Sequence, residues 1–315
     1  MADAGVESCR RALIAAVIAA QLAMLLLPPL LDFAVSLSGV SLFAIALLAA
    51  GALSGRARRP RLRALRTVLE VTGLSALLVA PILVLTYAAV RVGMPLADGA
   101  LIAADRALGF DWPAWLRLVD SSPALAALLG RAYDSFTAQL LLVPILLAAL
   151  GRHADAYRFV LSFFLLCALA SLVSVFFPCQ AAFVGHGFDP TTLRNVDAHY
   201  GTDFLASFEA ARSDPRFVLD GANAGGILTF PSVHAGMAVL CARGAWPSVP
   251  MRLAFVPINV LMFVSALTHG GHYLVDIVAG ALAALLAIKA AAALSRLAGP
   301  REPAADAPLA APQPA

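Results

Sequence analysis

Charged residues are scarce in this sequence. Only 13% of its 315 residues are Asp, Glu, Lys or Arg, while 61% are hydrophobic and the mean hydropathy is +0.86. A soluble domain of this length needs far more charge to cover its surface. The composition therefore excludes an ordinary soluble protein. The net charge of +3 is small and gives no sign of nucleic-acid binding, so we expect no nucleic-acid partner.

Cysteine is also scarce, with four residues that follow no recognisable spacing: Cys9, Cys167, Cys179 and Cys241. Metal sites and disulfide frameworks have characteristic cysteine spacings, and none occurs here. We therefore interpret these side chains as small hydrophobic residues of the core. We expect neither a metal nor a cofactor.

Long apolar runs are what the sequence has in abundance. Runs of about 20 residues recur along the chain, and each is long enough to cross the ~30 Å of hydrocarbon in a bilayer. Backbone groups in lipid must be bonded within the segment, and the runs lack the alternation of a membrane barrel. The sequence thus predicts an all-α, polytopic membrane bundle of about eight spans, near residues 12–31, 35–53, 67–90, 136–150, 157–179, 230–247, 252–268 and 272–295.

Arginine predicts the orientation of this bundle. Residues 56–66 form a short loop dense in arginine, and such loops stay cytoplasmic. Alternation through eight spans then places both termini inside. It places residues 91–135, residues 180–229 and the 269–271 turn outside. The stretch 91–122 has helix-like spacing, and its tryptophans suit a membrane–water interface.

Two polar motifs interrupt the C-terminal apolar region, residues 229–236 and residues 265–276. Ser232 is placed to cap the sixth span, and the glycine pair at 270–271 separates the seventh from the eighth. His234 and His272 should therefore lie at the same membrane depth. Asp276 follows His272 by four residues on one helix face, so its carboxylate can bond the imidazole.

These residue types favour phosphoryl transfer. A neutral imidazole can attack phosphorus, a carboxylate can fix its tautomer, and a second histidine can protonate the leaving oxygen. Glycine and helix N-terminal N–H groups can hold phosphate oxygens. Two alternatives stay open. His269 could join the other side chains in a metal-dependent hydrolase, or the histidines could relay protons in a non-enzymatic transporter or scaffold.

At these motifs the sequence resembles the phosphatidic acid phosphatase type 2 superfamily, and within it the branch of inositol phosphorylceramide synthases and their bacterial relatives. Pro231, Ser232 and His234 match the second motif, and Ser265, His272 and Asp276 match the third. The resemblance implies that His272 is the nucleophile, Asp276 its orienting partner and His234 the general acid. It implies a lipid-phosphate phosphatase or phosphotransferase with a phosphohistidine intermediate.

The resemblance covers roughly residues 67–296, a six-helix core. It leaves residues 1–66 as two additional spans with a basic loop, and residues 297–315 as a disordered Ala/Pro-rich tail. We expect a lipid phosphate or phospholipid as substrate, and the bacterial inner membrane as location, with the site facing the periplasm or exterior. Neither hydrolysis nor transfer to an alcohol is favoured by any residue.

Basic phosphate ligands are not found where the superfamily has them. Residues 177–183 contain no base, and Ala266 stands where an arginine is usual. Tyr133 and Gln139 lie near the outer end of the fourth span, where they either line the pocket or form ordinary interhelical hydrogen bonds. The residues that we expect to contact substrate are Ser232, Gly271, Tyr273, Tyr133 and Gln139.

The orientation is testable by labelling with a membrane-impermeant thiol reagent. We expect Ser213→Cys, in the 180–229 insert, to react from outside intact cells, and Ala57→Cys, in the arginine loop, to react only after the membrane is opened. Labelling of Ala57→Cys alone in intact cells would reverse the topology.

Overall fold

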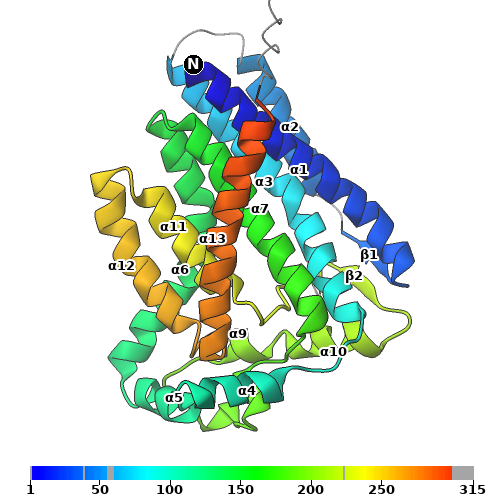
Figure 1. Cartoon of the computed structure of the whole chain (residues 1–315), viewed down its shortest axis with the longest axis vertical. Coiled ribbons are helices and arrows are strands. Elements are labelled where there is room, and N and C mark those ends of the chain that lie inside the picture. Colours follow the sequence, from blue (N-terminus) through cyan, green and yellow to red (C-terminus); the bar gives the residue numbers. More distant parts are fainter. Residues whose placement is uncertain (1, 38–39, 55–59, 223, 300–315) are drawn as a thin grey trace, which may run out of the picture.

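The computed structural model describes residues 2–37, 40–54, 60–222 and 224–299. Over these residues the chain is a bundle of helices with only two three-residue strands, so the expected polytopic helical membrane architecture is confirmed (Figure 1). The predicted tail from residue 300, and residues 55–59 of the arginine loop, lie outside the described part.

Long helices form the body of the bundle because uninterrupted apolar sequence in lipid satisfies its backbone only as helix. Among the described residues, five are long and apolar enough to cross a membrane: α1 (Ala2–Leu30), α3 (Pro60–Arg91), α6 (Pro123–Ala149), α7 (His153–Phe176) and α13 (Leu274–Leu297).

Three further predicted spans are shorter helices in the structure. They are α2 (Val40–Ser54), α11 (Val233–Ala245) and α12 (Val249–Ser265). The predicted spans 230–247 and 252–268 extend too far at one end each, because residues 229–232 and 266–273 form turns and not helix. The expected span 35–53 begins later because Ala34–Ser36 forms strand β1, which pairs in parallel with β2 (Val218–Asp220).

Short helices cover one end of the bundle, opposite the end where α1 begins and α13 finishes (Figure 1). They include α4 (Asp98–Ala107), α5 (Trp112–Asp120), α8 (Ala182–Gly185), the 3₁₀ turn Pro190–Thr192, α9 (His199–Thr202) and α10 (Leu205–Ser213). Trp112 corrects one expectation. Its ring is fully buried and its Nε1–H donates to the Leu267 carbonyl at 2.8 Å, so it ties α5 to the 266–273 turn instead of facing lipid.

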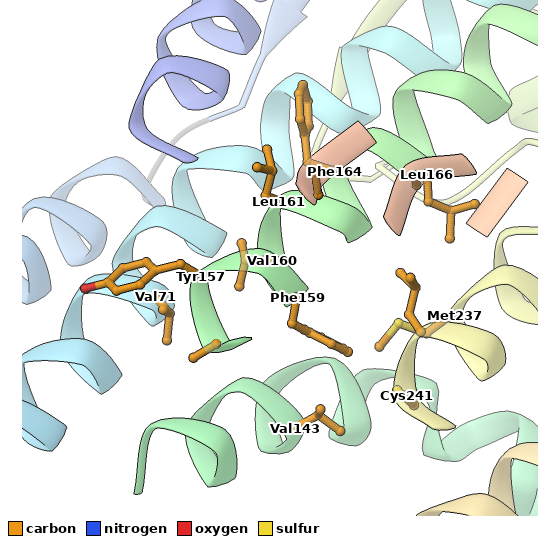
Figure 2. Packing of buried hydrophobic residues seen from close by; sticks show 14 of the residues in the cluster. Val71, Val143, Tyr157, Phe159, Val160, Leu161, Phe164, Leu166, Met237 and Cys241 are labelled. Carbon is orange, nitrogen blue, oxygen red and sulfur yellow. The ribbon is translucent and has the colours of Figure 1, made fainter. Parts of the chain in front are cut away.

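Helix α7 is the centre of the bundle and packs against α1, α3, α6, α11 and α13. Its buried side chains Phe159, Leu161 and Leu166 face this core together with Val143 of α6 and Met237 of α11 (Figure 2). Burial of such side chains against one another, and not against lipid tails, brings helices of very different sequence position into one close-packed unit.

A carboxylate joins three of these helices near their first residues. Glu70 of α3 is 4% exposed and accepts hydrogen bonds from Arg10 at 2.7 Å, Arg66 at 2.8 Å and Tyr157 at 2.6 Å. These donors come from α1, α3 and α7. A buried charge is tolerated only when it is paired and hydrogen-bonded, and Glu70 meets both conditions.

Removal of the Glu70 charge should therefore destabilise the bundle. In Glu70→Gln, Arg10 and Arg66 lose the carboxylate that both contact at under 3 Å, and Arg10 keeps only its longer contact with Glu7 at 3.5 Å, so we expect a loss of about 1.5–3 kcal/mol. Thermal unfolding in detergent would measure the effect. Glu7→Gln is the control, since Glu7 pairs with Arg10 and Arg11 in a more exposed position and should contribute less than about 1 kcal/mol. Equal shifts for the two variants would contradict this account.

Candidate active site

A histidine and an aspartate meet at the start of α13. The Nδ1 atom of His272 lies 3.3 Å from Oδ2 of Asp276, and the same oxygen accepts the backbone N–H of Tyr273 at 3.0 Å. Asp276 is fully buried and His272 is 4% exposed. A carboxylate at Nδ1 favours the tautomer with the proton on that nitrogen, which leaves the lone pair of Nε2 free.

Two carboxylates of α4 hold the start of α13 in place. Asp105 accepts the backbone N–H of Leu274 at 2.8 Å and that of Val275 at 2.9 Å, while Asp98 accepts the Tyr273 hydroxyl at 2.9 Å. Burial raises the pKa of Asp105 above its ordinary value, although the two N–H groups oppose this by stabilising the carboxylate. The first turn of α13 therefore has a fixed position and direction.

Helix α11 is brought against α13 at a glycine. A Cβ atom on Gly280 would overlap the carbonyl group of Ser232, so this close approach requires glycine. Ser232 also donates its backbone N–H to the carbonyl of Asp276 at 3.2 Å, and its hydroxyl caps α11 by accepting the N–H of Ala235 at 3.3 Å. His234, in the first turn of α11, is thereby placed near the His272–Asp276 pair.

His234 lies between two aromatic rings of α6. Its imidazole stacks on Tyr133 with ring centroids 4.1 Å apart and contacts Phe136 at 4.4 Å. The Tyr133 hydroxyl is 3.4 Å from His234 Nδ1. These contacts fix the orientation of the ring, and the partner at Nδ1 leaves Nε2 for other contacts.

Both histidines line one cavity of about 360 Å³, which we call the histidine cavity. Much of its wall is apolar and comes from α3, α6 and α7. Hydroxyl and backbone groups add a polar part beside the imidazoles. The lining comprises Ile82, Leu83, Thr86, Tyr133, Phe136, Thr137, Phe163, Cys167, Tyr200, Phe204, Gly226, Leu228, Thr229, Val233, His234, Gly270 and His272.

The residues expected to contact substrate do not all line the histidine cavity. Tyr133 lines the histidine cavity, whereas Ser232, Gly271, Tyr273 and Gln139 do not belong to its described wall. Ser232 caps α11, and Tyr273 bonds to Asp98. Gln139 accepts a hydrogen bond from Asn259 of α12 at 2.6 Å, which is the interhelical role considered from the sequence. Gly271 adopts a φ of 61°, a conformation that suits glycine in the turn before His272.

Positive charge is missing from the described wall of the histidine cavity, which includes no arginine or lysine. Among the arginines on the side of the bundle that the sequence predicts to lie outside, Arg131, Arg194 and Arg216 are exposed. Arg212 donates to the Met94 carbonyl at 3.0 Å and lies over the Phe208 ring. Imidazole and hydroxyl side chains are thus the polar groups of this wall that can contact an anion.

His269 is buried but is not part of the described cavity wall. Its Nδ1 lies 3.1 Å from the Thr268 hydroxyl, and burial lowers its pKa below the ordinary value, partly offset by Asp134 and Asp197. Within residues 2–37, 40–54, 60–222 and 224–299, no three His, Cys, Asp or Glu side chains gather in a group suited to a metal ion.

Sequence reasoning missed Asp98, Asp105 and the cavity residues of α3, α7 and α9. The stretch around Asp105 is polar within an otherwise apolar helix, a signal that could have indicated a buried partner. Ile82, Leu83 and Phe163 carry no such signal, because an apolar side chain facing a cavity has the same sequence pattern as one facing lipid.

These observations define an integral membrane helical bundle with a buried histidine–aspartate pair and a second histidine on one cavity. A family model described as the PAP2 superfamily matches residues 99–290, more than half of the chain, and the chain belongs to that superfamily of phosphatases and phosphotransferases. Neither the curated proteins nor the solved structures contain a match.

Asp105 should be required to position the site. In Asp105→Asn one of the two N–H groups of α13 faces an amide NH₂ instead of an acceptor, and an unsatisfied buried group costs about 1–3 kcal/mol. We expect a lower unfolding temperature in detergent and slower phosphate release.

The control for this variant is Asp111→Asn. Asp111 is exposed and caps α5 by accepting the N–H of Ala114 at 2.9 Å, and asparagine caps helices about as well. Wild-type stability and turnover in Asp105→Asn would show that the carboxylate does not hold α13.

Proposed function

We propose that this protein is a lipid-phosphate phosphatase or phosphotransferase that acts through a phosphohistidine formed on His272. The observation that carries the proposal is the presence of His272, bonded to Asp276, and His234 on the wall of one cavity. Membership of the PAP2 superfamily supports the reaction class.

In the first step, the Nε2 lone pair of His272 attacks phosphorus. An N–P bond forms and the bond to the leaving oxygen breaks, while His234, as imidazolium, gives that oxygen a proton. Asp276 accepts the Nδ1–H of His272 and offsets the positive charge that develops on the ring. The negative phosphate itself favours the protonated form of His234 by Coulomb attraction in a poorly solvated site.

In the second step, water or an alcohol attacks the phosphorus of the intermediate. The new O–P bond forms, the N–P bond breaks with its electron pair returning to His272, and the now neutral His234 accepts the proton. The two histidines therefore return to their starting states after each turnover.

The apolar part of the cavity supports a lipid substrate. Leu83, Phe163 and Leu228 offer a surface for an acyl chain beside the two imidazoles, and ligand sites are commonly apolar with a few polar groups that fix orientation. We further propose that the site faces the periplasm or exterior of a bacterial inner membrane. The arginine distribution supports this orientation.

Substitution of the two histidines tests the mechanism. His272→Ala should abolish turnover of every substrate, because no covalent intermediate can form. His234→Ala should slow release of a lipid alcohol by about 10²–10⁴-fold, the usual contribution of general acid catalysis, and should be far less impaired with a nitrophenyl leaving group that needs no proton. Phosphate release from a lipid phosphate and from a nitrophenyl ester would measure both.

Direct trapping supplies the second readout. Wild-type protein quenched during turnover should carry acid-labile, base-stable phosphate, and His272→Ala should carry none. Near-normal activity of His272→Ala would eliminate the phosphohistidine scheme. Loss of activity with a chelator and its recovery with zinc would favour the metal-dependent alternative.

A further inference from the structure

A second cavity, of about 150 Å³, lies among α6, α7, α11 and α13 at the end of the bundle where α13 finishes (Figure 1). We call it the arginine cavity, because Arg158 of α7 and Arg243 of α11 belong to its wall. The wall also includes Ile288 and Ala292, in the second half of α13. At ~1.5 Å per residue they lie roughly 20 Å or more along this helix from its first turn, so the cavity is remote from the histidine site.

The arginine cavity has an excess of positive charge. Its wall includes one carboxylate, Asp155, which accepts hydrogen bonds from Arg152 at 2.7 Å and from Arg158 at 3.3 Å. Arg243 is exposed and forms no ion pair with any residue that the structure describes. A guanidinium group without a counter-charge is available to an anion, and its planar fork matches the oxygen atoms of a phosphate.

A buried hydroxyl borders the same cavity. Ser162 of α7 is 4% exposed, and within the described part of the chain its hydroxyl forms no hydrogen bond. Buried polar groups usually have a partner, because burial without one is unfavourable. Ser162 follows Arg158 by four residues, so the hydroxyl and the guanidinium group lie on one face of α7. Together they suit a ligand whose oxygen atoms accept hydrogen bonds from both.

The rest of the wall and its position favour a lipid over a soluble anion. Leu147, Leu240 and Ile288 contribute apolar side chains from α6, α11 and α13. Trp246, which follows α11 and precedes Pro247 of the wall, is 56% exposed. An exposed tryptophan at the end of a membrane helix is typical of the headgroup region. Arg243 lies only three residues before Trp246, and therefore at the depth where phospholipids carry their phosphates.

We propose that the arginine cavity binds the headgroup phosphate of an anionic phospholipid from the leaflet at this end of the bundle. Arg158, Arg243 and Ser162 donate to the phosphate oxygens, as in other basic pockets between membrane helices. The cavity has room for roughly ten water molecules, so it accommodates a phosphate group while the acyl chains extend into the bilayer. Since the arginines belong to α7 and α11, the lipid joins the central helix to the helix that carries His234.

The test measures thermal unfolding of the purified full-length protein in nonionic detergent at fixed ionic strength, with phosphatidylglycerol as the probe. A ligand that binds the folded protein raises the unfolding temperature, and the lipid fraction of the micelle that gives half the maximal rise measures its affinity. This fraction should be at least about tenfold lower for phosphatidylglycerol than for phosphatidylcholine, which has no net charge. Inorganic phosphate at the same total concentration should give no rise, because it lacks the apolar part.

Arg243→Gln locates the binding site. Loss of a hydrogen bond to a charged group should raise the half-maximal fraction of phosphatidylglycerol at least about tenfold. Arg11→Gln is the matched control, since Arg11 is also exposed, lies on α1 near the same end of the bundle and is not on the described wall. It removes the same charge, and its exposed ion pair with Glu7 contributes little to folding. Its half-maximal fraction should stay within about twofold of the wild type.

Ser162→Ala supplies a second variant. Because the hydroxyl has no partner in the described protein, the lipid-free variant should keep its unfolding temperature, while its affinity for phosphatidylglycerol should fall about threefold or more.

Three outcomes would overturn the proposal. They are equal stabilisation by phosphatidylglycerol and phosphatidylcholine, a rise with inorganic phosphate equal to that with phosphatidylglycerol, and the same lipid affinity in Arg243→Gln and Arg11→Gln. None of these measurements requires turnover. An inactive protein would therefore remove the proposed phosphatase function and leave the lipid site standing.

Discussion

The first turn of α13 has its backbone N–H groups bonded by buried carboxylates. Asp276 accepts from Tyr273, and Asp105 accepts from Leu274 and Val275. The first N–H groups of a helix have no partners within it, and in a buried position they must find them elsewhere. Because α4 supplies two of these bonds, the surface helices and the membrane bundle meet at one point. The position of His272 follows from this arrangement, since the residue directly precedes the turn.

The placement of His234 depends on a contact of a different kind. Helix α11 approaches α13 closely only because position 280 carries no side chain, and the aromatic rings of α6 then hold the imidazole in place. Small residues at helix crossings are the usual means of close packing in membranes, where lipid offers no hydrophobic drive for helices to associate. The site is thus assembled by packing and backbone hydrogen bonds more than by charge.

Charge is distributed unequally between the two ends of the bundle. Near the start of α3, Arg10 and Arg66 surround Glu70, and these residues bind helices together. The described wall of the histidine cavity has imidazoles in place of arginines. An imidazole ring can both donate and accept a hydrogen bond, so the same groups can contact a phosphate and transfer protons during the reaction.

Sequence reasoning recovered the helical membrane class and a helix at each of the eight expected positions, because long apolar runs in lipid leave the backbone few choices. It was less accurate where helices end at the site. Turns such as 229–232 and 266–273 are stabilised by contacts with distant residues, for example the bond from Trp112 to Leu267. Local composition does not record such contacts, and this is also why Trp112 was expected at the interface.

The sequence alone indicated that His272 and Asp276, four residues apart, form a pair and that His234 belongs to a separate motif. The expected helix face was wrong, because α13 begins at Leu274 and His272 lies just before it, so the contact is made across the first turn of the helix. The tertiary structure decided the rest of the site. It placed Tyr133 in the cavity and Gln139 outside it, although the two lie on the same helix only six residues apart. It also gave Asp98 and Asp105 partners about 170 residues away along the chain. Which face of an apolar helix borders a cavity, and which buried carboxylate meets which N–H group, depends on how helices pack, and that packing involves the whole bundle at once.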